Sequence, residues 1–430
     1  MLERQLTTDA KGHFLNTNQC FSADGKWLVY DTRNDDSKIG RTGSIELVNV
    51  VTGEVKRLYH TRNQTEHGPG VGAASFSPAV NRVIFIHGIR NADEKNPYGF
   101  TRRTGVAIDV NNPEMPIFMD ARDIKEPFTP GALRGGTHAH SWSGDGQRLS
   151  FTYNDEVIAQ LSKTNPDVQD LRTVGVMFPR KVAVADEANG ENNCGEMFSV
   201  VVAKVTENPV AGSDDIDKAF DECWIGKRGY QKADGSWQVS AIAFQGNVKD
   251  ENGGTKTEIF VVDLPADLSL ANQGESLAGT VHHRPDVPMG VKQRRITFTK
   301  EGVIGPRHWL RSNLEGTQVV FLSKDPSGFI NVFAVSPNGG PVKQISFHLF
   351  DIQSGLNFSP DGQYISYVAQ NAIYITDVTT GESKQLTESS SDDDRPVSAV
   401  VWSPDGKVLA YNRYVKNEDN YLQIFLLEKE

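Results

Sequence analysis

A short motif recurs along this chain and constrains its fold more than any other feature. In each copy an alternating apolar stretch ends at a serine, an Asp-Gly pair follows, and a second alternating stretch begins. Glycine readily adopts the positive φ of a tight hairpin turn, so the pattern predicts two antiparallel β-strands joined by that turn. The clearest copies are QCFSADGKWLVYD (19–31), HSWSGDGQRLSFT (140–152), LNFSPDGQYISYV (356–368) and VVWSPDGKVLAYN (400–412).

Weaker copies extend the same repeat. ASFSPAVNRVIFI (74–86) and WLRSNLEGTQVVFL (309–322) retain most of the pattern, whereas EMFSVVVAKV (196–205) retains only a strand. Several hairpins are followed by two further strands, as in SIELVNVVTGEVKRL (44–58) and AIYITDVTTGESKQLT (372–387). Each full repeat therefore predicts a sheet of four antiparallel strands.

The spacing of the repeats predicts the architecture. Ser312, Ser359 and Ser403 are 47 and 44 residues apart, and a four-stranded propeller blade takes about 40–45 residues. Seven copies predict an all-β, seven-bladed β-propeller. The seventh copy ends after its third strand, and RQLT (4–7) matches the outer strand KQLT (384–387), so the N-terminal strand is expected to close the ring.

This arrangement assigns the whole chain, 1–430, to a single propeller domain. If EMFSVVVAKV begins the fourth blade, an insertion is needed at about 206–236. Within that insertion Ser213 is suited to cap a helix, because the apolar residues that follow have helical spacing. These residues are Ile216, Phe220 and Cys223.

Composition narrows the possible partners and locations. The formal net charge of −11 disfavours nucleic-acid binding, which requires a basic surface. No run of apolar residues is long enough for a transmembrane helix, so no membrane partner is expected. The opening residues, MLERQLTTDAKGHF, lack the apolar core of a signal peptide. We therefore expect a cytoplasmic protein, or a periplasmic one if a signal has been removed from this sequence.

Residues just before each hairpin should line the central channel, because the first strand of a blade faces the axis of a propeller. His138 and His140 lie two apart on such a strand and are expected to share a face. Together with His308 and an oxygen of Gln353 or Glu196, they form a candidate site for Mn, Ni, Zn or Fe. Alternatively, these histidines are hydrogen-bonded spacers of a polar channel.

Arginines in the same segments suggest an anionic ligand. Arg307 and Arg311 lie in PRHWLRS, and Arg134 precedes the histidine pair. Fixed guanidinium groups suit a carboxylate or phosphate, although ion pairs with Glu196 and Asp351 are an alternative. The predicted ligand-binding residues are Asn16, Asn18, Arg134, Glu196, Arg307 and Arg311.

The hairpins, the KQLT-type outer strands and the closing strand together resemble the TolB-like β-propellers. The segments NTNQCFSADGKWLVYD, LRGGTHAHSWSGDGQRLSFTYND, PRHWLRS and DIQSGLNFSPDG are similar to an uncharacterised bacterial family of TolB-like proteins. The resemblance covers most of the chain. It implies a propeller and brings no assigned activity.

A more distant similarity is to oligogalacturonate lyase, a cytoplasmic seven-bladed propeller. HAH at His138 and His140, and HW at His308, resemble the ligand segments of that family. The resemblance implies a manganese-type ion held by histidines and a glutamine, and cleavage of uronides by β-elimination. The chain departs from the family pattern, because residues 134–136 (Arg-Gly-Gly) stand where the glutamine is expected and the order of the histidine segments is swapped.

Two functional hypotheses follow from these observations. The chain is an enzyme with a metal-dependent, oligouronide lyase-like activity on a small anionic carbohydrate in the channel. Alternatively, it is a non-catalytic scaffold that binds a protein or a polysaccharide. A propeller peptidase is disfavoured because the sequence contains no GxSxG nucleophile motif.

Overall fold

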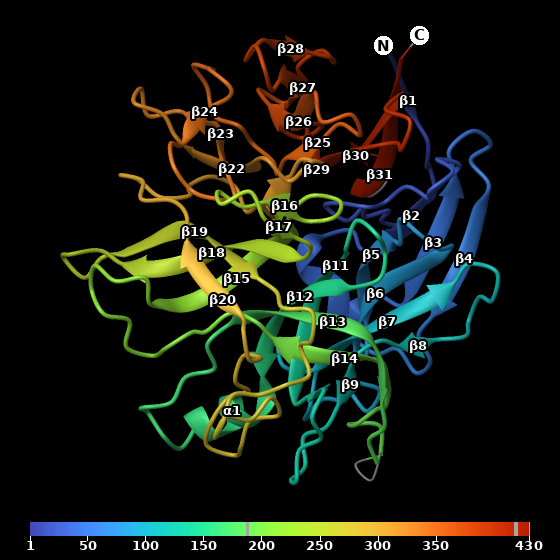
Figure 1. Ribbon diagram of the computed structural model, residues 1–430. Coiled ribbons are helices and arrows are strands. Elements are labelled where there is room, and N and C mark those ends of the chain that lie inside the picture. Colours follow the sequence, from blue (N-terminus) through green and yellow to red (C-terminus); the bar gives the residue numbers. More distant parts are fainter. Residues whose placement is uncertain (186–188, 417–419, 430) are drawn as a thin grey trace.

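The computed structural model describes residues 1–185, 189–416 and 420–429, and it confirms a seven-bladed β-propeller. The blades follow one another around the ring in chain order, from blue to red in Figure 1. The first blade contains β2 (Trp27–Asp31), β3 (Ser44–Asn49) and β4 (Val55–His60), and the second contains β5 (Val71–Phe76), β6 (Arg82–Gly88), β7 (Arg103–Asp109) and β8 (Ile117–Phe118). The third blade contains β11 (Gly135–Trp142), β12 (Leu149–Asp155), β13 (Thr173–Val182) and β14 (Gly195–Val201). The fourth contains β15 (Ile216–Trp224), β18 (Ala241–Lys249), β19 (Thr255–Asp263) and β20 (Lys292–Arg295).

Blades five to seven follow the same order of four strands. The fifth blade contains β21 (Arg311–Ser312), β22 (Val319–Lys324), β23 (Ile330–Val335) and β24 (Lys343–Gln344). The sixth contains β25 (Asn357–Phe358), β26 (Tyr364–Ala369), β27 (Ala372–Asp377) and β28 (Ser383–Gln385). The seventh contains β29 (Pro396–Trp402), β30 (Val408–Lys416), β31 (Asn420–Glu428) and β1 (Leu2–Gln5).

Short elements complete the fold. Isolated bridges at Phe14 and Phe21 place the preceding chain against β2, as the innermost part of the first blade. The described residues form two short helices outside the sheets, and neither has the length and apolar character needed to cross a membrane. The remaining elements are η1 (Asp36–Arg41), α1 (Glu156–Ser162), β9 (Ala121–Arg122), β10 (Ala132–Leu133), β16 (Tyr230–Gln231) and β17 (Trp237–Gln238).

The N-terminal strand closes the ring as predicted. β1 pairs antiparallel with β31, from Leu2 opposite Glu428 to Gln5 opposite Phe425, and the two chain ends lie together in Figure 1. Just beyond β1, the N–H of Leu6 donates to the carbonyl of Ile424 at 2.8 Å. The last sheet therefore contains strands from both ends of the chain, which removes an exposed edge.

The recurring turn has one hydrogen-bond pattern. In the sixth blade the Ser359 hydroxyl donates to Asp361 and accepts the N–H of Tyr364 at 2.9 Å, while Gly362 takes φ of 72°. The same serine-to-aspartate and backbone-to-serine bonds occur in three other blades. These bonds satisfy polar groups that the reversal of the chain would otherwise leave without partners, so they explain the motif.

The beginning of the fourth blade differs from our prediction. EMFSVVVAKV does not start this blade, because its residues form β14, the outermost strand of the third blade. The segment 206–236, expected to be a helical insertion, contains β15, the innermost strand of the fourth blade. Register shifts between Ile216 and Lys218 and between Phe220 and Cys223 interrupt the alternation of β15. The interruptions give its apolar residues a spacing that imitates a helix.

Candidate functional site

A cavity of about 330 Å³ opens at one end of the central channel. We call it the channel-mouth cavity. Innermost segments of the first, second, third, fifth, sixth and seventh blades contribute to its wall. Six residues selected from the sequence line it together, although they are far apart in the chain: Asn16, His138, Arg307, His308, Arg311 and Gln353.

Irregular backbone recurs in the innermost strands around the channel, and three of the irregular positions, Ala73, Ala139 and Ser398, line this cavity. The innermost strands of the second, third, fourth and seventh blades each contain a register shift with one non-glycine residue at positive φ. A bulge bends a strand and changes where the neighbouring side chains point, and such features are frequent beside functional sites. The residues at positive φ are Ala73 (55°), Ala139 (56°), Asp221 (50°) and Ser398 (63°).

The bulge at Ala139 separates the two histidines that were expected to share a face. His138 lines the channel-mouth cavity, whereas His140 is 1% exposed and lies against Gly105 of the second blade. His140 Nε2 is 2.9 Å from the Thr137 hydroxyl. The expectation of one shared face is wrong because the extra residue of the bulge reverses the alternation between the two positions.

The residues expected to bind a metal ion are not arranged as a metal centre. His308 accepts the N–H of Leu322 at Nε2, 3.1 Å away, and its Nδ1 is 2.9 Å from the carbonyl of Pro306. Both ring nitrogens of His308 are therefore occupied, and neither has a lone pair to offer a metal ion. Across residues 1–185, 189–416 and 420–429, no three His, Cys, Asp or Glu side chains are grouped so that they could hold a metal.

Arg311 is the most unusual charged group of the site. Its residue is 8% exposed, and it donates to Asn357 Oδ1 at 2.8 Å and to the carbonyls of Leu310 and Thr17, both at 2.9 Å. All three acceptors are neutral, and burial lowers the pKa of Arg311 to about 10. A guanidinium carries five N–H groups, so this cation retains donors beyond these three hydrogen bonds.

Arg307 also lines the channel-mouth cavity and is more exposed than Arg311. Its side chain is 48% exposed, and its guanidinium lies 4.5 Å from the centre of the Trp309 ring. It pairs with the buried Asp221 at 3.1 Å and lies 3.3 Å from His138 Nε2. Burial, together with the charges of Arg103 and Arg307, lowers the pKa of His138 well below 6.5, so its imidazole is neutral at pH 7.

Three predicted ligand-binding residues lie elsewhere, and the structure corrects their placement. Glu196 is on the outermost strand β14, is exposed, and pairs with Lys181 at 3.0 Å. Asn18 lines two cavities at the opposite end of the channel. Arg134 is 1% exposed and pairs with Asp155 at 2.9 Å. Glu196 was misplaced because a strand resembling a repeat was assigned to the wrong blade.

Sequence reasoning missed a group of cations beside the cavity. Arg103 begins β7, Arg172 directly precedes β13, and Lys218 lies in β15. We call these three residues the basic cluster. They were missed because two of them lie outside the innermost strands, and Lys218 lies in the strand that was predicted as a helix. Burial and the neighbouring Arg172 lower the pKa of Lys218.

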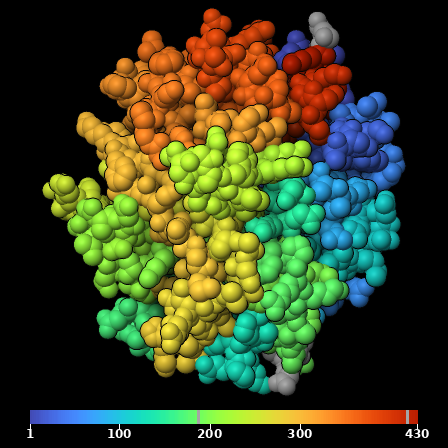
Figure 2. All heavy atoms as spheres, in the orientation of Figure 1, coloured from blue at the N-terminus to red at the C-terminus, as the bar shows by residue number. Residues whose placement is uncertain are grey.

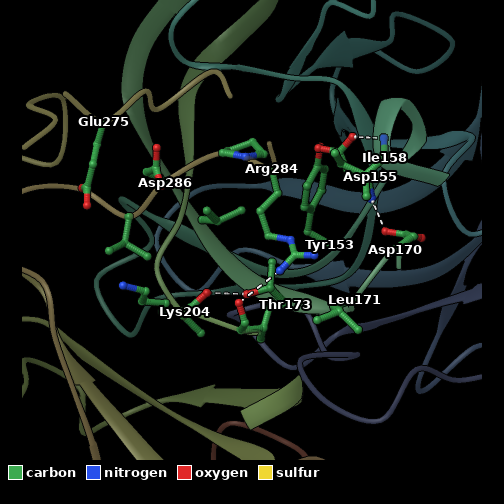
Figure 3. Close-up of a pocket in the computed structure, with 15 residues that line it drawn as sticks. Tyr153, Asp155, Ile158, Asp170, Leu171, Thr173, Lys204, Glu275, Arg284 and Asp286 are labelled. Carbon is green, nitrogen blue, oxygen red and sulfur yellow. Dashed lines mark hydrogen bonds between the residues drawn. The ribbon is translucent and has the colours of Figure 1, made fainter. Parts of the chain in front are cut away.

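A second cavity, of about 110 Å³, lies beside α1 (Figure 3). Its wall includes Tyr153, Asp170 and Arg284, and the loop 264–291 covers it. Arg134 holds this loop through the carbonyls of Thr280 and His283. Figure 2 shows the loop as a yellow band on the surface of the molecule. The arginines of this region fasten a loop, so Arg134 has a structural role here.

The fold and the site define a seven-bladed β-propeller whose channel mouth gathers positive charge in an acidic chain. The uncharacterised protein YidR of Escherichia coli K12 is 36% identical over 416 residues, which are 95% of this chain and 94% of YidR. The chain therefore belongs to the YidR family. Residues 70–192 match a family of proteins of unknown function (DUF3748), and residues 341–418 match the N-terminal region of dipeptidyl peptidase IV.

Solved structures share the fold at low sequence identity. An oligogalacturonate lyase in complex with manganese has a TM-score of 0.53 and 11% identity, covering 100% of this chain and 93% of its own. The propeller domain of the Trilobed protease of Pyrococcus furiosus has a TM-score of 0.50 and 11% identity, covering 98% and 97%. TolB of Acinetobacter baumannii has a TM-score of 0.37 and 13% identity, covering 95% and 81%. At these identities the likeness concerns the fold alone.

Proposed function

We propose that the channel-mouth cavity binds a small anionic carbohydrate of the uronide type. One observation carries this proposal. Arg311 is a buried guanidinium at the cavity wall, and its hydrogen bonds to described residues all go to neutral oxygens. A buried charge is usually paired, because leaving water is unfavourable for an unpaired ion. A ligand carboxylate would supply the missing negative charge and accept the N–H groups that remain.

Other groups in the cavity suit the rest of such a ligand. The ring of Trp309 provides an aromatic surface in the cavity, and Arg307 lies over that ring with its side chain half exposed. Gln353 accepts the N–H of Asn371 through Oε1, and its amide group offers donors for a hydroxyl. The volume of about 330 Å³ is at the lower end of the range for small-molecule sites. A ligand of one or two sugar rings is therefore supported by size as well as charge.

The similarity to oligogalacturonate lyase also favoured a metal-dependent elimination. The residues expected to hold the metal do not fit that role, because His308 uses both nitrogens in hydrogen bonds and His140 lies outside the cavity. We therefore propose binding of the anion and assign no catalytic step. Recognition of a protein partner stays a prediction from the sequence.

The proposal is tested by isothermal titration calorimetry with galacturonate and with galactose, its neutral counterpart. Wild-type protein is expected to bind galacturonate more tightly than galactose. Arg307→Gln should weaken galacturonate binding by about tenfold, since a charge-assisted hydrogen bond contributes roughly 1.5–3 kcal/mol. Arg57→Gln is the matched control, because Arg57 is also an exposed arginine paired with a carboxylate, Glu114, but lies on the outer strand β4.

Equal affinity for galacturonate and galactose would contradict the proposal. So would an equal loss of affinity in Arg307→Gln and Arg57→Gln, because that result would reflect net charge instead of a contact in the cavity.

A further inference from the structure

The basic cluster brings like charges together. The guanidinium groups of Arg103 and Arg172 lie 5.2 Å and 5.1 Å from the centre of the same ring, that of Phe100. Lys218 Nζ lies 4.4 Å from the ring of Phe220. Burial lowers the pKa of Arg172, and the nearby charges of Arg103 and Arg307 lower it further. Repulsion of this kind is unfavourable for the protein alone and is relieved when an anion binds.

Nearby carboxylates are already committed to other partners. Asp221 pairs with Arg307 at 3.1 Å, and Asp217 pairs with Lys249 at 3.5 Å. Asp170 accepts the N–H of Asp155 at 2.8 Å, and burial raises its pKa to about 6. In the described part of the chain, none of the three basic side chains forms a salt bridge. The carboxylates nearest the basic cluster therefore act on Arg172 and Lys218 without forming a direct ion pair with them.

Arg103 provides an independent sign that this cluster is a site. Its residue is only 2% exposed, yet its Nε has no hydrogen-bond partner among the described residues. Its side chain donates one long hydrogen bond, 3.4 Å from a terminal nitrogen to the Tyr98 hydroxyl, within the described part of the chain. Buried guanidinium donors are normally satisfied, so a group of this kind calls for an acceptor from outside the chain.

The basic cluster lies close enough to the channel-mouth cavity for its charges to act on residues there, although none of its three members lines the cavity. His138 lines the cavity, and its pKa is lowered by burial and by the charges of Arg103, Arg307 and Arg172. Arg307 also lowers the pKa of both Arg172 and Lys218, so it connects the two groups of cations. A ligand bound at Arg307 would therefore lie near the basic cluster.

We infer that Arg103, Arg172 and Lys218 form a second anion subsite, which holds another carboxylate or a phosphate of the same ligand. The inference rests on the proposed function, because it extends the ligand of the channel-mouth cavity. It narrows that ligand to a carbohydrate with at least two separated negative charges, such as an oligouronide or a phosphorylated uronic acid. A ligand with one charge would leave the cluster unpaired.

The first test compares digalacturonate with galacturonate by calorimetry. Wild-type protein is expected to bind digalacturonate about tenfold or more tightly than galacturonate, because the second carboxylate gains charge-assisted hydrogen bonds. The ratio of the two affinities should fall towards one in Arg172→Gln and in Lys218→Gln. Arg180→Gln is the matched control: Arg180 lies on β13, stacks on Phe198, and is exposed away from the cavity. It should retain the ratio.

The second test uses inorganic phosphate, with sodium chloride at equal ionic strength as its reference, and needs no sugar. Phosphate at ten times its dissociation constant should raise the unfolding temperature of wild type by about 2 °C more than that of Arg172→Gln. The same rise in both proteins, together with equal affinity for the two uronates, overturns the inference. If galacturonate itself fails to bind while the phosphate difference is observed, the proposed function fails and the second subsite stands.

Discussion

At the residue scale, two buried ionisable groups directly follow bulges in the innermost strands. Glu222 and His140 occupy corresponding positions, each directly after a residue at positive φ. Glu222 is 1% exposed and accepts the Thr152 hydroxyl at 3.1 Å. Burial raises the pKa of Glu222 from 4.5 to about 7. Ionisation of this carboxyl is therefore harder in the folded protein than in the unfolded chain.

The raised pKa of Glu222 predicts how its replacement changes stability with pH. Its stabilising effect is fully present below pH 4.5 and is lost as pH rises through about 7. Glu222→Gln should therefore unfold with a free energy about 2–3 kcal/mol above wild type at pH 8, and close to wild type at pH 4.5. Urea unfolding at both pH values measures this. Glu315→Gln, at an exposed position, should show no such pH dependence, and a loss of stability in Glu222→Gln at pH 8 would contradict the prediction.

At the scale of elements, the Ser-x-Asp-Gly turn joins the innermost segment of four blades to the next strand. Gly362 has φ of 72°, and a Cβ placed on it would meet its nearest atom, an oxygen of Glu315, at 3.8 Å. There is space for a side chain, so conformation alone decides the effect of a substitution. Gly362→Ala should lower the free energy of unfolding by about 1 kcal/mol, because an alanine is strained in this region.

Gly362→Asn separates conformational strain from other effects of the same turn. Asparagine tolerates the left-handed region better than alanine, so this variant should retain more of the stability of the wild type. Denaturant unfolding of the two variants provides the measurement. Equal stability of Gly362→Ala and wild type would show that the positive φ is not required at this turn.

At the scale of the whole molecule, the ring depends on the junction between its first and last residues. The side chain of Leu6 packs on the apolar cluster between the first and last blades, and its N–H donates to Ile424 at 2.8 Å. Leu6→Pro removes both contributions, whereas Leu6→Ala removes only the packing. We expect Leu6→Pro to unfold at lower denaturant concentration than Leu6→Ala and to aggregate, because the edge of β31 becomes available to other chains.

Size-exclusion chromatography and thermal unfolding of the two Leu6 variants check this expectation. If Leu6→Pro stays monodisperse and matches Leu6→Ala in stability, the hydrogen bond from Leu6 to Ile424 contributes little to the closure of the ring. Thr8→Pro is the control for general effects of proline in this segment, because Thr8 is exposed and follows the junction.

Sequence reasoning located the repeats well and the site only in part. Six predicted residues share the channel-mouth cavity, because aligning the copies on their serines identifies segments that a propeller brings to one axis. The same alignment failed at Glu196, where a strand without a turn motif was taken for a blade start. It could not find Arg103 or Arg172 either, because both lie outside the innermost strands.

The sequence by itself determined the hairpins and the closing strand, because turn chemistry and two-residue alternation depend on neighbouring residues. The count of seven blades was correct although one copy, at 196–205, was assigned to the wrong blade. Only the tertiary structure decided which side chains meet in the channel. Bulges at Ala139 and Asp221 alter where the neighbouring side chains point, and no short-range sequence pattern predicts these bulges. The basic cluster arises in the same way, since its three cations come from three different blades and are neighbours only in the closed ring.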